Sequence, residues 1–424
     1  MSELPPGWAW TTLGRAAAPG HPKVSPASLP NLPFIGMEHV EAQTMRLLAT
    51  ARAGEMKSAA VHFEAGDVLS GRLRPYLNKV LRPSFEALAS AEFNVIPPSA
   101  AIDQRFLQYI LNSGQFVSFA SHLNAGDRPR VDFEQIGNFE LALPPLAEQR
   151  RIVAEIEKLF SNLEAAQALL CAAQKKLSLY DASTLNRAFR SGHPLCRIGD
   201  VFDVYVGSTP SRSVREYWGG GTPWVSSSEV AFCRLAVTRE TISPFGLANS
   251  SVKVHPPGTV LLGMIGEGKT RGQAAILDIE AGNNQNSAAI RVSAAGYPPE
   301  YLFWFLVSEY ERTRNIGSGN NQPALNKSRV EDMRFPLAPL PEQVRIAANL
   351  EQAMSVTSSL KQTVSGCLTR ADRLRQAILK KASEGKLVSQ DPNDEPASVL
   401  LERIRATRAQ TPARRTPRKR EVRA

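Results

Sequence analysis

The sequence contains one motif twice, and this repeat restricts the fold more than any other feature. Residues 145–152 (PLAEQRRI) recur as residues 339–346 (PLPEQVRI), at an offset of 194 positions. In both places a strand-rich stretch precedes the motif and a long helical pattern follows it. Such a repeat is far too long for a solenoid, and each copy is large enough to bury its own core. We therefore predict two similar modules, each followed by a long helix.

The repeat extends through the whole body of the chain. The 194-residue offset holds without a gap from residues 128–131 (against 322–325) to Leu185 (against Leu379). Matches with small shifts are residues 66–71 with 258–263 and Leu13-Gly14 with Ile198-Gly199. The expected boundaries are 1–145 for the first module, 146–192 for its helix, 193–338 for the second module, 339–390 for its helix and 391–424 for a disordered basic tail.

Apolar residues in each predicted helix recur at alternating steps of four and three. In the first copy they are Ile152, Ile156, Leu159, Leu163, Ala166, Leu170, Ala173, Leu177 and Tyr180. The matching positions of the second copy are Ile346, Leu350, Ala353, Thr357, Leu360, Val364, Cys367, Ala371 and Leu374. This is a heptad pattern, and a long helix with one apolar stripe is stable only when the stripe is buried.

Two arrangements would bury these stripes: a homodimeric coiled coil, or antiparallel pairing of the two helices within one chain. The matched registers and comparable lengths favour the second. The expected fold class is therefore α+β, with two globular domains joined by two long antiparallel helices that form an intramolecular coiled coil. The internal repeat gives this fold a pseudo-two-fold character.

Composition restricts the compartment and the partners. The chain has no apolar run long enough for a membrane span, no signal-like start, and four scattered cysteines without metal-ligand spacing. We expect a cytoplasmic protein without a structural metal. The net charge is +10, but residues 403–424 hold nine Lys or Arg and one Glu and so carry +8 of it. That tail is either an inert solubilising segment or a nonspecific DNA contact. The modules carry little of the net charge, so DNA binding by them requires local clusters of basic or polar side chains.

Two kinds of local cluster occur, at matched places in both modules. The first follows a strand-like segment and consists of Arg72, Arg74, Tyr76, Asn78 and Lys79 in module 1, and of Lys269, Thr270 and Arg271 in module 2. The second consists of Arg128 and Arg130 in module 1, and of Asn320, Asn321, Gln322 and Lys327 in module 2. Long cationic side chains reach phosphates, and Arg and amide side chains pair with base edges. Solvated surface loops and ordinary turns are the alternative interpretation of both clusters.

Residues 263–270 (GMIGEGKT) match the phosphate-binding G-x-x-x-x-G-K-T motif, but the context contradicts it. A P-loop opens a helix, whereas Arg271-Gly272 and the apolar residues 274–277 follow at once. No room remains for the crossover helix of a parallel βαβ unit. We predict a strand, a glycine-rich turn and a second strand instead.

Several motifs together resemble the specificity subunit of type I restriction-modification systems. The residues that carry the resemblance are 326–328, 335–346 (FPLAPLPEQVRI), 374–379, 384–387, 207–210 (GSTP), 217–221 (YWGGG) and 223–225. The resemblance covers about residues 1–390. Module 1 lacks the Tyr-Trp-Gly-Gly stretch and depends on the repeat for its assignment, and the basic tail is outside the family pattern.

This resemblance implies a DNA-recognition subunit without catalysis of its own. Each module would read one half of a bipartite target in double-stranded DNA, and the helix pair would set the gap and dock two methyltransferase subunits. Docking candidates at the helix starts are Glu148, Gln149, Arg151, Glu342, Gln343 and Arg345. S-adenosylmethionine, ATP and Mg²⁺ would belong to the methyltransferase and the two restriction subunits, with no cofactor in this chain. The competing classes are a P-loop ATPase and a coiled-coil scaffold that does not bind DNA.

Overall fold

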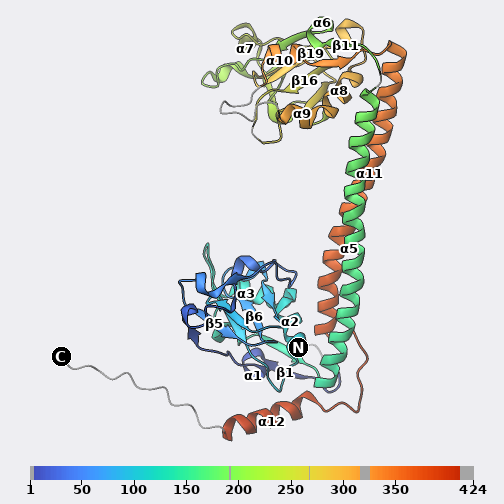
Figure 1. The fold of residues 1–424 in the computed structure, drawn as a ribbon. Helices are drawn as coiled ribbons and strands as arrows, with labels where there is room; N and C mark the ends of the chain where they lie inside the picture. The colour runs from blue at the N-terminus through green and yellow to red at the C-terminus, as the bar shows by residue number, and fades with distance from the viewer. Residues whose placement is uncertain (1–3, 191, 267, 316–324, 411–424) are drawn as a thin grey trace, which may run out of the picture. The chain divides into compact units, whose positions relative to one another are not determined.

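The computed structural model describes residues 4–190, 192–266, 268–315 and 325–410 (Figure 1). The chain divides into two compact units. Unit 1 consists of residues 1–169 and 367–424, and unit 2 consists of residues 170–366. Each unit contains one of the expected modules together with part of each long helix. The α+β fold class with an internal duplication is confirmed.

The two long helices are α5 (Leu146–Phe189) and α11 (Leu340–Ser383), each of 44 residues. Both begin directly after a proline and carry a glutamate in the first turn, where the helix dipole favours negative charge. After α11, Gly385 adopts a left-handed conformation with φ of 68°. The backbone N–H of Lys386 then donates to the carbonyl of Lys381 (2.9 Å) and satisfies a terminal acceptor. The proline before α11 and the glycine after it therefore mark its two ends.

Contacts between the long helices show that they run antiparallel. The Gln167 side chain donates to Asp372 (3.1 Å) within unit 1. Within unit 2, Lys361 pairs with Asp181 (2.5 Å). Residue numbers rise along α5 while those of the partners fall along α11, which is the signature of antiparallel packing. The intramolecular helix pair is confirmed.

The buried stripe differs from the predicted seam in the middle of the pair. Ile152 and Ile156 are fully buried as expected, but Ala166, Tyr180 and Leu360 are exposed. A pair of helices covers only a narrow stripe on each partner, so apolar residues at the margin of the stripe stay in contact with solvent. These exposed residues become relevant to partner binding below.

Module 1 is built from short strands in three sheets with small helices on them. The strand orders are β1 (Ala9–Thr12) with β10 (Glu140–Leu143); β2 (Lys23–Val24), β5 (Ala60–Phe63), β8 (Ala87–Ser90), β3 (Pro33–Ile35) and β4 (Ala51–Arg52); and β7 (Val80–Leu81), β6 (Val68–Gly71) and β9 (Phe93–Ile96). The α-helices are α1 (Leu13–Ala16), α2 (Gln104–Asn112), α3 (Gly114–His122) and α4 (Phe133–Ile136), and the 3₁₀ helices are η1 (Pro26–Ser28), η2 (Met37–His39), η3 (Ala53–Glu55) and η4 (Pro75–Leu77).

Module 2 repeats this plan with variations. Its strand orders are β11 (Leu195–Arg197) with β20 (Arg334–Pro336); β12 (Asp203–Val206), β19 (Ser287–Arg291), β16 (Thr259–Gly263), β17 (Ala274–Leu277) and β14 (Cys233–Leu235); and β15 (Glu240–Ile242), β13 (Trp218–Val225) and β18 (Gly282–Asn283). Its helices are α6 (Ile198–Val201), α7 (Pro244–Ala248), α8 (Pro299–Ser308), α9 (Tyr310–Asn315) and α10 (Lys327–Glu331), with η5 (Arg215–Tyr217), η6 (Ser227–Glu229) and η7 (Ser293–Ala295).

Equivalent backbone contacts support the match between the modules. The N–H of Leu13 donates to the carbonyl of Phe139, and the N–H of Ile198 donates to the carbonyl of Met333, both at 2.9 Å. Leu13 and Ile198 are both fully buried. The shifted match of these residues in the sequence therefore corresponds to one shared contact in the fold.

Each module shares its hydrophobic core with the long helices. In unit 1, the core cluster joins Trp8 and Phe106 to Ile152 at the start of α5 and to Leu379 near the end of α11. In unit 2, the corresponding cluster contains residues of α8, the start of α11 and the end of α5. Each module is thus fixed to both helices by apolar burial, at roughly 1.5–3 kcal/mol for each large side chain.

Two local expectations have clear outcomes. The G-x-x-x-x-G-K-T stretch lies between β16 and β17, which pair antiparallel, so the strand-turn-strand interpretation is confirmed. The expectation of disorder from residue 391 onward is wrong for residues 397–410, which form helix α12 (Ala397–Gln410). Ala397 and Leu400 are buried against unit 1, and this burial stabilises a segment whose composition suggested disorder.

Within the described ranges, no helix is long and apolar enough to cross a membrane. The same ranges contain no group of three or more His, Cys, Asp or Glu side chains placed to hold a metal ion.

Candidate nucleic-acid interface and helix starts

The two predicted clusters of module 1 lie side by side in the structure. Leu73 forms an isolated antiparallel bridge with Arg130. The N–H of Val131 donates to the carbonyl of Arg72 (2.9 Å), and the N–H of Arg74 donates to the carbonyl of Pro129 (2.7 Å). Segments 72–79 and 126–131, which we call loop pair 1, therefore form one continuous surface although they are far apart in the sequence.

The tip of loop pair 1 has a strained backbone. Arg74 and Asn78 flank η4 with φ of 51° and 49°, a left-handed conformation that costs non-glycine residues about 1–3 kcal/mol each. The buried Asn78 side chain donates to the carbonyl of Asn112 (3.0 Å) and helps to hold this turn. The turn presents Tyr76 to solvent with 47% of its surface exposed.

Three residues predicted to contact DNA serve the protein itself. Arg72 donates to the carbonyls of Ala91 and Val131, and Lys79 donates to the carbonyl of Met37 (2.6 Å). Asn78 is buried. In this structure the donors of these side chains hold the loops in place. The buried Asn78 is corrected to a structural role, and DNA contact by the partly exposed Arg72 and Lys79 stays a prediction.

The exposed part of loop pair 1 contains several basic side chains and one aromatic side chain. Arg74 is half-buried, Arg128 is exposed, and Arg130 is exposed while paired with Glu92. Together with Tyr76 they are basic or aromatic side chains of this surface that are accessible to a large ligand, and the exposed Asp127 lies beside Arg128.

Module 2 has an equivalent pair of segments. The N–H of Leu325 donates to the carbonyl of Met264 (3.0 Å), which matches the Val131–Arg72 contact of module 1. The adjacent turn exposes Lys269 and half-exposes Thr270. We call this surface, formed by residues 264–272 and 325–327, loop pair 2.

The other candidates of module 2 have mixed positions. Arg271 is mostly buried, and its guanidinium donates to the carbonyl of Arg314 (2.5 Å). Lys327, in the first turn of α10, pairs with Glu331 (3.4 Å). Asn320, Asn321 and Gln322 lie outside the described residues.

The repeated glutamine has the same role at both helix starts. Gln149 donates to the carbonyl of Pro144 (3.0 Å), and Gln343 donates to the carbonyl of Ala338 (2.8 Å). Both glutamines are buried. We therefore correct their assignment as partner-docking residues: they connect each helix start to the strand that precedes it.

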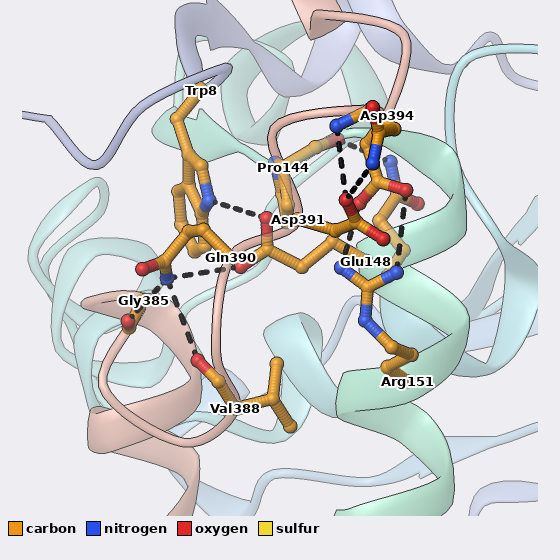
Figure 2. Close-up of polar contacts among 11 residues, drawn as sticks. Trp8, Pro144, Glu148, Arg151, Gly385, Val388, Gln390, Asp391 and Asp394 are labelled. Carbon is orange, nitrogen blue, oxygen red and sulfur yellow. Dashed lines mark hydrogen bonds and ion pairs between the residues drawn. The ribbon is translucent and has the colours of Figure 1, made fainter.

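Glu148 is enclosed by residues of the same chain (Figure 2). Its carboxylate accepts hydrogen bonds from the Trp8 indole N–H (3.0 Å) and from the Gln390 amide (3.2 Å). Arg151, one turn later, makes two contacts with Asp394 (2.6 and 3.3 Å). Glu148 is fully buried, so it is also corrected as a direct docking residue. Burial raises the pKa of Glu148 above its usual value of 4.5, and its hydrogen bonds oppose this shift.

We expect Glu148 to make the stability of module 1 depend on pH. Because its pKa is raised in the folded state, its contribution is full below pH 4.5 and is lost as the pH rises through the folded pKa. Glu148→Gln cannot ionise, so the variant should lose less stability than the wild type between pH 4.5 and 7. Urea unfolding across this range measures the effect. Glu140→Gln, at an exposed position, is the matched control, and an unchanged pH dependence in Glu148→Gln would contradict the prediction.

A family model described as "Type I restriction modification DNA specificity domain" matches residues 30–170 and 195–366. The chain belongs to this family. The two matched regions contain loop pair 1 and loop pair 2, and each extends into the long helix that follows its module.

Curated relatives carry the same description. The specificity subunit of type I restriction enzyme StySPI from Salmonella potsdam is 24% identical over 383 residues, which cover 80% of this chain and 79% of the relative. The EcoDI specificity subunit from Escherichia coli is 27% identical over 195 residues. That match spans only 45% of this chain and 43% of the EcoDI subunit.

Solved structures share the fold of this specificity-family chain. A chain from a structural study of complex assembly and conformational transition in the type I restriction-modification system is 25% identical, with a TM-score of 0.78. The match covers 91% of this chain and 100% of that chain. The HsdS subunit from Thermoanaerobacter tengcongensis is also 25% identical, with a TM-score of 0.60 and coverage of 91% and 98%.

Sequence reasoning missed the segment after α11 that covers Glu148 and Arg151. One signal was present, because Ala397, Leu400, Leu401 and Ile404 have the three-four spacing of an amphipathic helix. Asp391 also forms a turn with Asn393, whose N–H donates to its carboxylate (2.9 Å). A turn followed by an apolar helical stripe indicates a docked segment more than a disordered tail.

Proposed function

We propose that this chain is the DNA-reading subunit of a type I restriction-modification complex, and that each module reads one half of a bipartite target. The observation that carries the proposal is the presence of matched loop pairs in two modules of a specificity-family chain. A reader of two separated half-sites needs two similar surfaces, and DNA-reading loops need donors that reach phosphates and base edges.

The proposed DNA contacts are the accessible side chains of the two loop pairs. In module 1 they are Arg74, Tyr76, Arg128 and Arg130. In module 2 they are Lys269, Thr270 and Lys327. We also propose Asn320, Asn321 and Gln322, which lie outside the described residues, as DNA contacts. Arg128 and Lys269 suit phosphates or guanine edges, and Tyr76 offers a ring that can stack or pack in a groove. Arg130 is available to DNA once it leaves Glu92.

The long helices are proposed to set the gap and to bind partner subunits. Leu177, Tyr180, Ala353, Val356 and Leu360 line a groove between α5 and α11 within unit 2. Tyr180, Val356 and Leu360 are about half exposed there, which is unusual for apolar side chains without a partner. We propose that methyltransferase subunits, two per chain, cover such surfaces.

The remaining chemistry is assigned to the partners. In this proposal the methyltransferase subunits bind S-adenosylmethionine, and two restriction subunits use ATP and Mg²⁺, while this chain acts in the cytoplasm as the recognition component. Its own residues position DNA and partners and transfer no group.

Sequencing of modified bases in the source genome, with and without this gene, tests the proposal. We expect a split motif of two short half-sites that is methylated only when the gene is present. A purified complex of this chain with an active methyltransferase partner that methylates without any split motif would contradict it.

A further inference from the structure

The two helix starts share their sequence motif and their internal hydrogen bonds, yet only one of them is covered. Glu148 corresponds to Glu342, and Arg151 corresponds to Arg345, in the two copies of the motif. Each glutamate also has a ring as neighbour from the segment before the first strand of its module. For Glu148 this neighbour is the Trp8 indole, whose N–H donates to it (3.0 Å), and for Glu342 it is the His193 ring, whose Nε2 lies 3.4 Å from the carboxylate.

In module 1, residues 385–396 cover the helix start, and we call them the strap (Figure 2). The strap supplies one amide donor to Glu148, from Gln390, and one carboxylate to Arg151, from Asp394. The Asp394 side chain is only 9% exposed, so this ion pair lies in a protected position. The strap is followed by α12, whose first N–H, at Ala397, donates to the carbonyl of Gly7 (2.9 Å).

In module 2, the same face of the helix start is open. Leu340 is 48% exposed, whereas its counterpart Leu146 is only partly exposed. Val344 is 57% exposed, and its counterpart Arg150 is exposed as well. Glu342 is partly exposed, and Arg345 is largely exposed and pairs with Glu342 in its own helix turn (3.2 Å). Among the described residues, we find no counterpart of Gln390 or Asp394 at this face.

We propose that the open face at the start of α11 binds an extended, acidic segment of the methyltransferase subunit, whereas the strap already fills the equivalent face of α5. The inference rests on the proposed function, because it takes the partner to be that subunit. It adds that the two helix starts are unequal and that only one of them receives the partner segment.

The strap indicates the chemistry of this segment. A carboxylate would pair with Arg345, as Asp394 pairs with Arg151, and a side-chain amide would donate to Glu342, as Gln390 donates to Glu148. Apolar side chains of the partner segment would cover Leu340 and Val344. This contact would remove the exposed apolar surface of both residues from water. Charge pairs of this kind, once desolvated, contribute strongly to partner specificity.

Reversal of charge on the open face tests the inference. The double variant Val344→Asp with Arg345→Glu should weaken the binding of the purified methyltransferase subunit by about tenfold or more. Arg150→Asp is the control for an added acidic side chain at the other helix start, because Arg150 is exposed and precedes Arg151, which the strap holds. It should change the affinity by less than about twofold. Isothermal titration with the full-length chain gives the affinity, and circular dichroism confirms that both variants are folded.

The outcomes separate the inference from the proposed function. If both variants weaken binding equally, the two helix starts are equivalent and the inference is wrong. If the wild-type chain binds the methyltransferase subunit and the double variant binds it equally well, the inference fails while the proposed function stands. If the wild-type chain does not bind that subunit at all, the proposed function fails.

A photo-crosslinking amino acid at position 340 identifies the occupant. We expect a crosslink to a methyltransferase peptide that contains Asp or Glu. A crosslink to residues 385–396 of a second copy of this chain would show that the strap of that copy occupies the open face. This result would overturn the inference that a methyltransferase segment binds there. A crosslink to a partner peptide without acidic residues would also overturn the proposed recognition.

Discussion

Seven residues inserted at matched levels of both long helices should lengthen the gap between the methylated half-sites by about three base pairs. Gln167 of α5 contacts Asp372 of α11, so insertions before these two residues lie at the same level of the helix pair. One added heptad preserves the buried stripe and extends each helix by about 10.5 Å. At about 3.4 Å per base pair, this distance corresponds to three base pairs.

Modified-base sequencing of cells that carry the insertion variant measures the gap directly. Seven residues inserted after Gln410, at the end of α12, are the control and should leave the motif unchanged. An insertion in α5 alone breaks the match between the two helices and should reduce methylation. Methylation at the original spacing by the doubly inserted chain would show that the helix pair does not set the gap.

Each loop pair should govern one half-site only. Tyr76→Ala with Arg128→Ala should weaken recognition of one half by about 1–3 kcal/mol per lost contact, because a stacked ring or a paired guanidinium contributes about that much. Lys269→Ala should weaken binding through the other module. The complex of each variant with its methyltransferase partner is titrated with duplexes that carry one intact and one scrambled half-site.

The intact half-site identifies the module that a variant damages. The variant with Tyr76 and Arg128 replaced should bind poorly to the duplex whose intact half-site is the one read by module 1. The Lys269 variant should bind poorly to the duplex whose intact half-site is the one read by module 2. Arg52→Ala, an exposed arginine of β4 outside loop pair 1, is the control for lost charge. Equal losses at both half-sites in each variant would exclude separate reading by the two modules.

The duplication and the helix lengths were predictable from the sequence because they depend on local patterns. The Pro-Leu-x-Glu-Gln motif, the heptad spacing and Gly385 are all visible without knowledge of the fold. The proximity of residues 72–79 and 126–131 was not predictable in the same way. It depends on pairing between Leu73 and Arg130, which no periodic pattern reports.

The roles of individual side chains were the hardest to predict. Residue type alone suggested that Arg72 and Lys79 face DNA, but a guanidinium or ammonium also donates to main-chain carbonyls of its own fold. Gln149 and Gln343 repeat for the same reason, since each closes a helix start. A repeated polar residue therefore indicates a shared local structure as readily as a shared binding surface.

The division of the chain affects the order in which it folds during synthesis. Unit 2 is one continuous segment, whereas unit 1 is assembled from residues 1–169 and 367–424. The core of unit 1 joins Trp8 and Leu13 to Leu379 and Ala397, which leave the ribosome last. At about 5–20 residues per second, the first-made module waits roughly 10–40 s for the segment that completes its core. The half of the protein made first therefore finishes folding last, and its apolar surface is the part of the nascent chain that chaperones must protect.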